Sequence, residues 1–219
     1  DKSVTYIYDI FSKKLTEVAP FTVDLLLPSG AENLNYVLYT DESPYKMQRE
    51  WLDRLPFDIY SVNVHTGAKR LIGRSYRTAP KWSVNGKWAV MYDPIAQVWN
   101  KFDGATGKVV NISDAIGYPM FMESYDKPAP APAYGIAGWT ADGNNVFLYD
   151  AYDWWKIDLT GERQPECLTK GYGRKHGKSI RKMTSNIDKD VFQKDEKVIV
   201  SLWDKDTMDE GVYQLDMKG

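Results

Sequence analysis

Cysteine, histidine and long hydrophobic runs are all scarce in this 219-residue sequence. The single cysteine, Cys167, excludes an internal disulfide framework and a cysteine-rich metal site. No stretch approaches the roughly 20 consecutive apolar residues that a membrane-spanning helix needs, so we expect no membrane span. The formal net charge is only −2, which gives no reason to expect a nucleic acid as partner.

Aromatic residues, by contrast, are plentiful. They make up 14% of the sequence, with 8 tryptophans and 15 tyrosines. Aromatic side chains favour β-strands and need large flat packing partners. The length and the apolar fraction of 43% together allow one sizeable domain with a real core. Composition therefore favours an all-β globular fold.

An ungapped internal repeat relates residues 82–93 to residues 139–150, at an offset of 57 residues. Both copies read aromatic, hydroxyl, any residue, Asn or Asp, Gly, and then apolar residues that end in Tyr-Asp. The Asn-Gly and Asp-Gly pairs favour a tight turn, and the alternation after them is typical of a strand. Weaker copies occur at 36–41 and 198–204, which makes four copies in all.

A second repeated element follows each copy. It is a strand pattern ending at a glycine turn, at 58–63, 97–103, 153–158 and 211–216. After the first three, a closing strand is predicted around Leu71-Ile72, Ile112-Ser113 and Leu168-Thr169. Residues 6–16 resemble only the second half of such a unit.

Short strands in units of about 40 to 50 residues indicate blades of a β-propeller. We predict an all-β fold, a partial propeller of about four four-stranded blades from a larger propeller, with residues 1–219 as one domain. A Greek-key sandwich is the alternative, but it does not predict the ungapped repeat. The approximate units are 1–17 (partial), 18–73, 74–114, 133–170 and 187–219 (partial).

Two insertions account for the remaining length. Residues 43–56 are compatible with a short helix. Residues 118–134 carry a Pro-Ala-Pro-Ala-Pro run, which favours extended polyproline geometry. We interpret this second insertion as a rigid loop between blades, because the repeat continues across it, and a linker between separate domains is the alternative.

Several motifs invite a catalytic interpretation, and each departs from the required pattern. The string 73–77 lacks the last glycine of the Gly-x-Ser-x-Gly turn of serine hydrolases. Residues 173–179 have one residue too few between their glycines for a phosphate-binding loop and are interpreted as a solvated turn. Residues 204–210 are rich in carboxylates, but they lack the glycine and glutamate of a calcium loop.

Isolated side chains are interpreted as structural. His65 and His176 are expected at the surface, and Cys167 is expected as a small buried residue of a closing strand. Trp154 and Trp155 are adjacent in a strand, so they must point to opposite faces and cannot both line one stacking platform. We assign no catalytic, cofactor-binding or metal-ligating residue.

Asp93, Asp150 and Asp204 stand at equivalent positions of three units. Hydrolysis of a polysaccharide would need paired carboxylates at one channel. A residue that recurs blade after blade instead indicates a structural hydrogen bond in each blade.

Residues 135–140, 148–158 and 168–174, with the proline-rich run just before them, resemble the propeller region of bacterial prolyl oligopeptidase and dipeptidyl peptidase IV-like serine peptidases. The likeness covers most of the chain. It implies a seven- or eight-bladed propeller followed by an α/β-hydrolase domain that holds a Ser, Asp and His triad. That hydrolase domain is absent from this sequence, so no catalytic residue and no substrate-gripping glutamate can be matched to a position here.

The resemblance implies a non-catalytic portion of a serine peptidase that gates the access of peptide substrates. Its partners would be the remaining blades and the hydrolase domain, it would need no cofactor, and its location would be periplasmic or secreted. The alternative is a free-standing propeller that serves as a scaffold for protein partners.

Overall fold

The computed structural model describes residues 4–20, 23–29, 35–52, 54–183 and 190–218. Contacts within the chain group it into two compact units. Among the described residues, no helix is both long and apolar enough to cross a membrane. Unit 1 comprises Asp1–Trp82, Gly86–Ile95 and Asn100–Val110, and unit 2 comprises Ser83–Asn85, Ala96–Trp99 and Asn111–Gly219.

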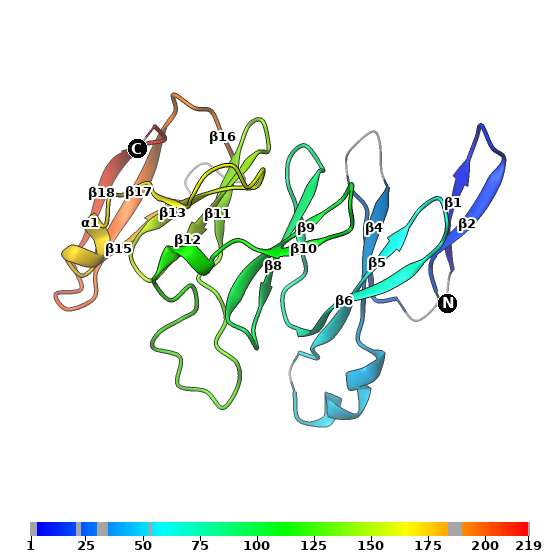
Figure 1. Ribbon diagram of the computed structural model, residues 1–219. Helices are drawn as coiled ribbons and strands as arrows, with labels where there is room; N and C mark the ends of the chain where they lie inside the picture. Colours follow the sequence, from blue (N-terminus) through cyan, green and yellow to red (C-terminus); the bar gives the residue numbers. More distant parts are fainter. Residues whose placement is uncertain (1–3, 21–22, 30–34, 53, 184–189, 219) are drawn as a thin grey trace. The chain divides into compact units, whose positions relative to one another are not determined.

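A hairpin and a four-stranded antiparallel sheet, the first sheet, belong to unit 1 (Figure 1). The strands of the first sheet are neighbours in the order in which they follow one another in the sequence. The hairpin strands are β1 (Thr5–Asp9) and β2 (Lys14–Ala19). The sheet strands are β3 (Leu25–Leu27), β4 (Tyr36–Asp41), β5 (Phe57–Asn63) and β6 (Lys69–Tyr76).

The second sheet repeats this arrangement with four strands in chain order, and its residues are divided between the two units. The third sheet lies in unit 2 and has a fifth short strand, β16, that pairs in parallel with β11. The second sheet consists of β7 (Lys81–Trp82), β8 (Trp88–Asp93), β9 (Val98–Asp103) and β10 (Val109–Asn111). The third consists of β11 (Ile136–Thr140), β12 (Asn145–Tyr149), β13 (Trp154–Asp158), β14 (Glu166–Cys167) and β16 (Val191–Phe192).

The fourth sheet has three described strands, in the order β15-β17-β18. Helical segments are short, and each lies in a connection between strands. The strands are β15 (Lys178–Lys182), β17 (Lys197–Asp204) and β18 (Glu210–Asp216). The helical segments are the 3-10 helices η1 (Ser43–Glu50) and η2 (Asp114–Ile116) and the α-helix α1 (Tyr172–Lys175).

The turns have the chemistry that the repeat predicts. Gly86 and Gly143 both adopt the left-handed conformation, with φ of 66° and 68°. Asp or Asn at the end of a strand accepts a hydrogen bond from the backbone N–H two residues later, which fixes the turn. This bond recurs at Asp9, Asp41, Asn63, Asp93, Asp103, Asp150, Asp158, Asp204 and Asp216.

The central strands are buried on both faces. In β4, Val37 and Tyr39 join one apolar cluster with Val18 of the hairpin, while Leu38 joins a second cluster with Met91 of β8. Successive side chains of a strand point to opposite faces of the sheet, so each face of β4 has its own packing partner. In unit 2, Phe147, Tyr149 and Trp154 of the third sheet pack with Val198, Val200 and Leu202 of the fourth.

Small sheets that follow one another in the chain and pack face to face are the construction of propeller blades. The contact between β4 and both of its neighbours follows this rule within unit 1, and the contact of the third sheet with the fourth follows it within unit 2. The chain is all-β, and its sheets are those of a partial β-propeller.

The structure departs from the predicted elements in small ways. The closing strands end at Asn111 and Cys167, just before the predicted Ile112-Ser113 and Leu168-Thr169, although the N–H groups of Ile112 and Leu168 still bond back to the adjacent strand. The fourth sheet includes β15, which precedes residue 187, where the unit was predicted to start. Residue 187 itself and the predicted turn glycine Gly219 lie outside the described residues.

Candidate functional site

Two groups of arginine side chains are the most distinctive chemical features of the described residues. The first, in unit 2, is a closed network around Arg174 and Asp150, which we call the Arg174 cluster. The second, in unit 1, is an open cavity lined by three arginines, which we call the arginine pocket.

Asp150 is the centre of the Arg174 cluster. It follows β12 at the repeated aspartate position and is fully buried. Its Oδ1 accepts hydrogen bonds from the N–H groups of Tyr152 (2.7 Å) and Asp153 (2.6 Å). Its Oδ2 accepts from Trp155 Nε1 (3.1 Å) and faces the Arg174 guanidinium at 3.4 Å. A buried carboxylate with this many donors is well compensated for its loss of water.

Asp153 positions the short helix that carries Arg174. Its carboxylate accepts the Thr169 hydroxyl (2.6 Å) and the N–H groups of Gly173 and Arg174 (2.9 Å each). A Cβ at Gly173 would lie 2.6 Å from the Lys178 carbonyl oxygen, so glycine is required for this close approach.

Arg174 joins this network to the 118–134 insertion. Its guanidinium lies 3.0 Å from a carboxylate oxygen of Glu123 and stacks at 4.5 Å on Tyr118 and 5.0 Å on Tyr152. Burial alone would lower the pKa of Arg174, but the Glu123 hydrogen bond and the Asp150 charge raise it above the ordinary value. Glu123 in turn donates its N–H to the Tyr134 hydroxyl (3.0 Å), which ties the first part of the insertion to its last residue.

A second arginine, Arg181, closes the other side of Asp150. Its guanidinium donates to the carbonyl oxygens of Asp150 (2.8 Å) and Ala151 (3.1 Å), and it lies over the rings of Tyr149 and Tyr134. Burial lowers the pKa of Arg181, and the charge of Asp150 partly opposes this effect. The arginines of this cluster are therefore engaged in holding the fold together.

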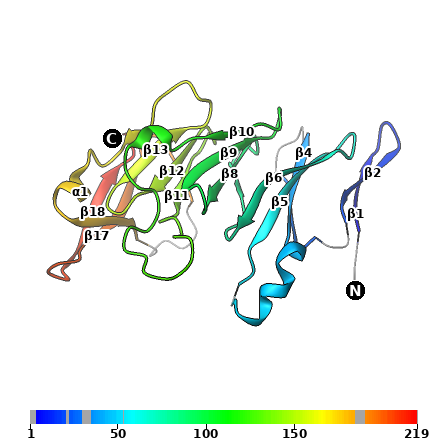
Figure 2. The same cartoon turned by 60° about the horizontal axis from the view of Figure 1, so that its bottom comes forward.

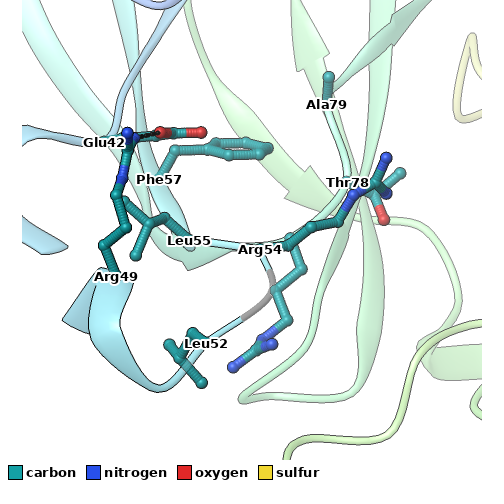
Figure 3. A pocket seen from close by; sticks show the side chains of 9 residues that line it. Glu42, Arg49, Leu52, Arg54, Leu55, Phe57, Thr78 and Ala79 are labelled. Atoms are coloured by element: carbon teal, nitrogen blue, oxygen red, sulfur yellow. Dashed lines mark hydrogen bonds and ion pairs between the residues drawn. The ribbon is translucent and has the colours of Figure 1, made fainter. Parts of the chain in front are cut away.

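The arginine pocket has a volume of about 820 Å³ (Figure 3). This size lies in the range of small-molecule and peptide sites. Its walls come from the connection between β4 and β5, from the start of β5, and from the segment between β6 and β7. The lining residues are Glu42, Arg49, Leu52, Arg54, Leu55, Phe57, Arg77, Thr78 and Ala79.

The 43–56 insertion forms one wall of the pocket because it is fastened to the first sheet. Asp58 is buried, and it accepts the Tyr45 hydroxyl of η1 (2.5 Å) and the N–H of Ser75 in β6 (3.1 Å). Burial, and then this bond to Asp58, raises the pKa of Tyr45. Figures 1 and 2 show η1, in light blue, in the connection that leads into the start of β5.

The charges of the pocket are unequally paired. Arg49 lies 3.5 Å from Glu42, and the Glu42 N–H donates to Asp24 (2.6 Å). Arg54 and Arg77 are exposed and form no ion pair with any other described residue. Leu55 is a buried lining residue of the pocket, and Figure 3 shows Leu55 and Phe57 between the Arg49–Glu42 pair and Arg54.

The histidines and the acidic loop lie where they were predicted. His65 is exposed in the β5–β6 turn, with Nε2 3.3 Å from Asn35 Oδ1. His176 is exposed after α1, and its ring lies 4.4 Å from that of Tyr172. Residues 204–210 form the β17–β18 turn, where bonds from the N–H groups of Thr207 and Asp206 lower the pKa of Asp204.

Two other interpretations need correction. Residues 173–179 are not a solvated turn, because Arg174 is partly buried in a network and β15 starts at Lys178. Cys167 is half-buried rather than fully buried, and burial raises the pKa of its thiol. Trp154 and Trp155 do face opposite sides: Trp154 lies in the apolar cluster, and Trp155 bonds to Asp150.

Sequence reasoning did not find either arginine group. The Arg174 cluster had a partial signal, since Asp150 stood at a repeated position. The arginines of the arginine pocket lie in connections that do not repeat, and nothing in their spacing brings them together. Among the described residues, no three histidine, cysteine, aspartate or glutamate side chains lie close enough together to hold a metal ion.

No protein-family model and no curated protein matches the chain. Solved structures that it is similar to include a protein described as TolB from Agrobacterium tumefaciens, at 13% identity and a TM-score of 0.36, over 98% of this chain and 90% of that one. Another is the β-propeller domain of the Trilobed protease from Pyrococcus furiosus, at 14% identity and a TM-score of 0.35, over 87% of this chain and 57% of that one. A third, from a nidogen/laminin complex, has 10% identity and a TM-score of 0.27, over 97% of this chain and 89% of that one. These likenesses are too low to carry an argument, so the assignment of the fold rests on the chain's own sheets and repeat.

Proposed function

We propose that this chain is the non-catalytic propeller portion of a prolyl oligopeptidase or dipeptidyl peptidase IV-like serine peptidase. In this role it admits peptides to an α/β-hydrolase domain that these 219 residues do not contain. A periplasmic or secreted location is part of the same proposal.

The single observation that carries the proposal is that the segments resembling this family form one hydrogen-bonded network in the structure. Residues 148–158 and 168–174 supply Asp150, Asp153 and Arg174, which build one closed network and fasten the 118–134 insertion through Glu123. Loops held on a rigid scaffold commonly carry the binding surfaces of a fold. A fixed insertion suits a propeller that has to filter peptides by size.

Exposed apolar faces support a larger propeller. In the fourth sheet, Ile199, Trp203 and Val212 are between 39% and 62% exposed, although the other face of β17 is buried. In the hairpin, Tyr6, Tyr8 and Leu15 are between 48% and 60% exposed. We propose that the remaining blades of the parent protein cover these faces, because the central strand β4 is buried on both of its faces.

The test is to clone the complete reading frame and assay it on chromogenic peptides beside this chain alone. We expect a Gly-x-Ser-x-Gly turn downstream, turnover by the complete protein, loss of turnover when that serine is replaced by alanine, and none by the chain alone. Turnover by the chain alone would contradict the non-catalytic role.

A free-standing scaffold is the second candidate. The exposed apolar face of the fourth sheet favours it as much as it favours the peptidase proposal, because a protein partner could cover that face as further blades would. A reading frame that stops after one closing strand would support the scaffold and overturn the peptidase proposal.

A further inference from the structure

The arginine pocket has an excess of positive charge beside apolar side chains. Three arginines line it with one glutamate, and that glutamate is already paired with Arg49. Arg54 and Arg77 therefore offer guanidinium groups that no described carboxylate neutralises. A guanidinium presents a planar set of donors that matches a carboxylate or a phosphate.

The apolar part of the pocket favours the carboxylate of a peptide over a bare anion. Leu52, Leu55 and Phe57 line the pocket with the arginines, and Figure 3 shows Leu55 and Phe57 between the Arg49–Glu42 pair and Arg54, with Leu52 beside Arg54. A phosphate ion would leave these side chains without a partner, whereas an apolar residue next to a carboxylate would cover them. Covering such a side chain stabilises a complex by about 25 cal/mol for each Å² removed from water.

We infer that the arginine pocket binds the C-terminal residue of a peptide. The apolar side chain of that residue packs on Leu52, Leu55 and Phe57, and its α-carboxylate accepts hydrogen bonds from Arg54 and Arg77. This inference does not depend on whether the chain belongs to a peptidase, because it uses only residues of unit 1.

Hydrogen bonds to Asp58 hold the walls of the pocket in place before any ligand binds. Asp58 fixes η1 and β6 through Tyr45 and Ser75, so the wall that carries Arg49 and the strand that leads to Arg77 are tied to the same carboxylate. A preformed site loses less conformational entropy when it binds.

The experiment titrates the complete chain with N-acetyl-Gly-Leu-Phe bearing a free C-terminal carboxylate and with the same peptide as its C-terminal amide. Binding is measured by calorimetry and located by the NMR signals of the Leu52 and Leu55 methyl groups. We expect the free acid to bind at least tenfold more tightly than the amide and to shift both leucine signals.

Matched variants separate the charge of the pocket from charge in general. Arg54→Gln with Arg77→Gln should abolish the preference for the free acid. Arg74→Gln, in strand β6 just before Arg77 but outside the pocket lining, should keep it. All three arginines are exposed, so the substitutions should leave the fold intact, which far-UV circular dichroism checks.

Several results would overturn the inference. One is equal affinity for acid and amide, and another is an equal loss in Arg74→Gln. If N-acetyl-Gly-Glu-Phe amide binds as tightly as the free acid, the site takes an internal acidic residue instead. If inorganic phosphate at equal concentration displaces the peptide, the site is a general anion site. None of these results bears on the peptidase assay, which tests the proposed function separately.

Discussion

The Arg174 cluster and the arginine pocket place arginine side chains in opposite environments. In the cluster, the Arg174 guanidinium is partly buried between two carboxylates and two tyrosine rings. In the pocket, Arg54 and Arg77 are exposed and face no described carboxylate. The difference lies in the acceptors within reach: the fold supplies two carboxylates to Arg174, whereas Arg54 and Arg77 have no ion-pair partner among the described residues.

The two regions also differ in their acids. Asp150 and Asp153 are 0% and 1% exposed and together accept seven hydrogen bonds from side chains and backbone. Glu42 of the pocket has one cation at 3.5 Å and remains partly open to solvent. Screening by water makes such an exposed pair weak, while the buried network is strongly coupled.

The largest effect should come from removing the central acid of the cluster. We expect Asp150→Ala to lower the free energy of unfolding by about 3–5 kcal/mol, because it leaves Trp155 Nε1, two backbone N–H groups and Arg174 without their acceptor. Urea unfolding followed by tryptophan fluorescence measures the change.

The matched control is Asp204→Ala, at the equivalent position of the fourth sheet. Asp204 accepts two backbone N–H groups and faces Lys178 at 3.7 Å near the surface, so we expect a much smaller loss than at Asp150. Equal losses at the two positions would mean that the network adds nothing to the repeated turn.

A smaller effect is expected at Arg174 itself. Arg174→Gln keeps much of the contact with Tyr118 and Tyr152 but loses the ion pair with Glu123, so we expect a loss of about 1–3 kcal/mol. The 118–134 insertion should also become more sensitive to trypsin at Lys127, which limited proteolysis detects.

Arg77→Gln should change the free energy of unfolding by no more than about 0.5 kcal/mol, and a larger loss there would show that the pocket arginines also stabilise the fold.

The fold could be predicted from the sequence because its information is local and repeated. The Asn85-Gly86 and Asp142-Gly143 pairs set the turns, and the residues after them alternate as strands. Even the 57-residue offset has a physical counterpart, since the Asn85 side chain donates to the Asp142 carbonyl oxygen at 2.8 Å. Within unit 1, the Ser29 hydroxyl donates in the same way to the carbonyl of Gly86, 57 residues later.

The two arginine groups could not be predicted in the same way because they depend on contacts between segments that do not repeat. Glu123 belongs to an insertion and meets Arg174 only because Asp153 turns α1 toward it. Arg54 and Arg77 stand in two different connections, and only the folded first sheet places both at one cavity. Periodicity carries no information on either meeting.

The last effect concerns the tyrosines next to these regions and appears only at alkaline pH. Burial, and then the charge of Asp93, raises the pKa of Tyr76 from its ordinary value of 10 to about 12. Burial also raises the pKa of Tyr149, but the N–H of Lys182 and the charge of Arg181 oppose that rise. The charge of Arg181 therefore favours the ionised form of Tyr149, whereas the charge of Asp93 disfavours the ionised form of Tyr76.

Because the folded state holds the Tyr76 proton more tightly than the unfolded state, this contribution to stability is complete below pH 10 and is lost as the pH rises toward 12. We expect Tyr76→Phe to remove about 1 kcal/mol of the loss that the native chain shows between pH 9 and pH 11, and Tyr149→Phe to remove less. Unfolding free energies measured at both pH values, each compared with the same variant at pH 9, separate this titration from the packing cost of the substitution. A greater effect of Tyr149→Phe would mean that the charge of Arg181 does not favour the ionised form of Tyr149. The charged neighbours of Tyr149 and Tyr76 would then not act on the two hydroxyl groups in opposite directions.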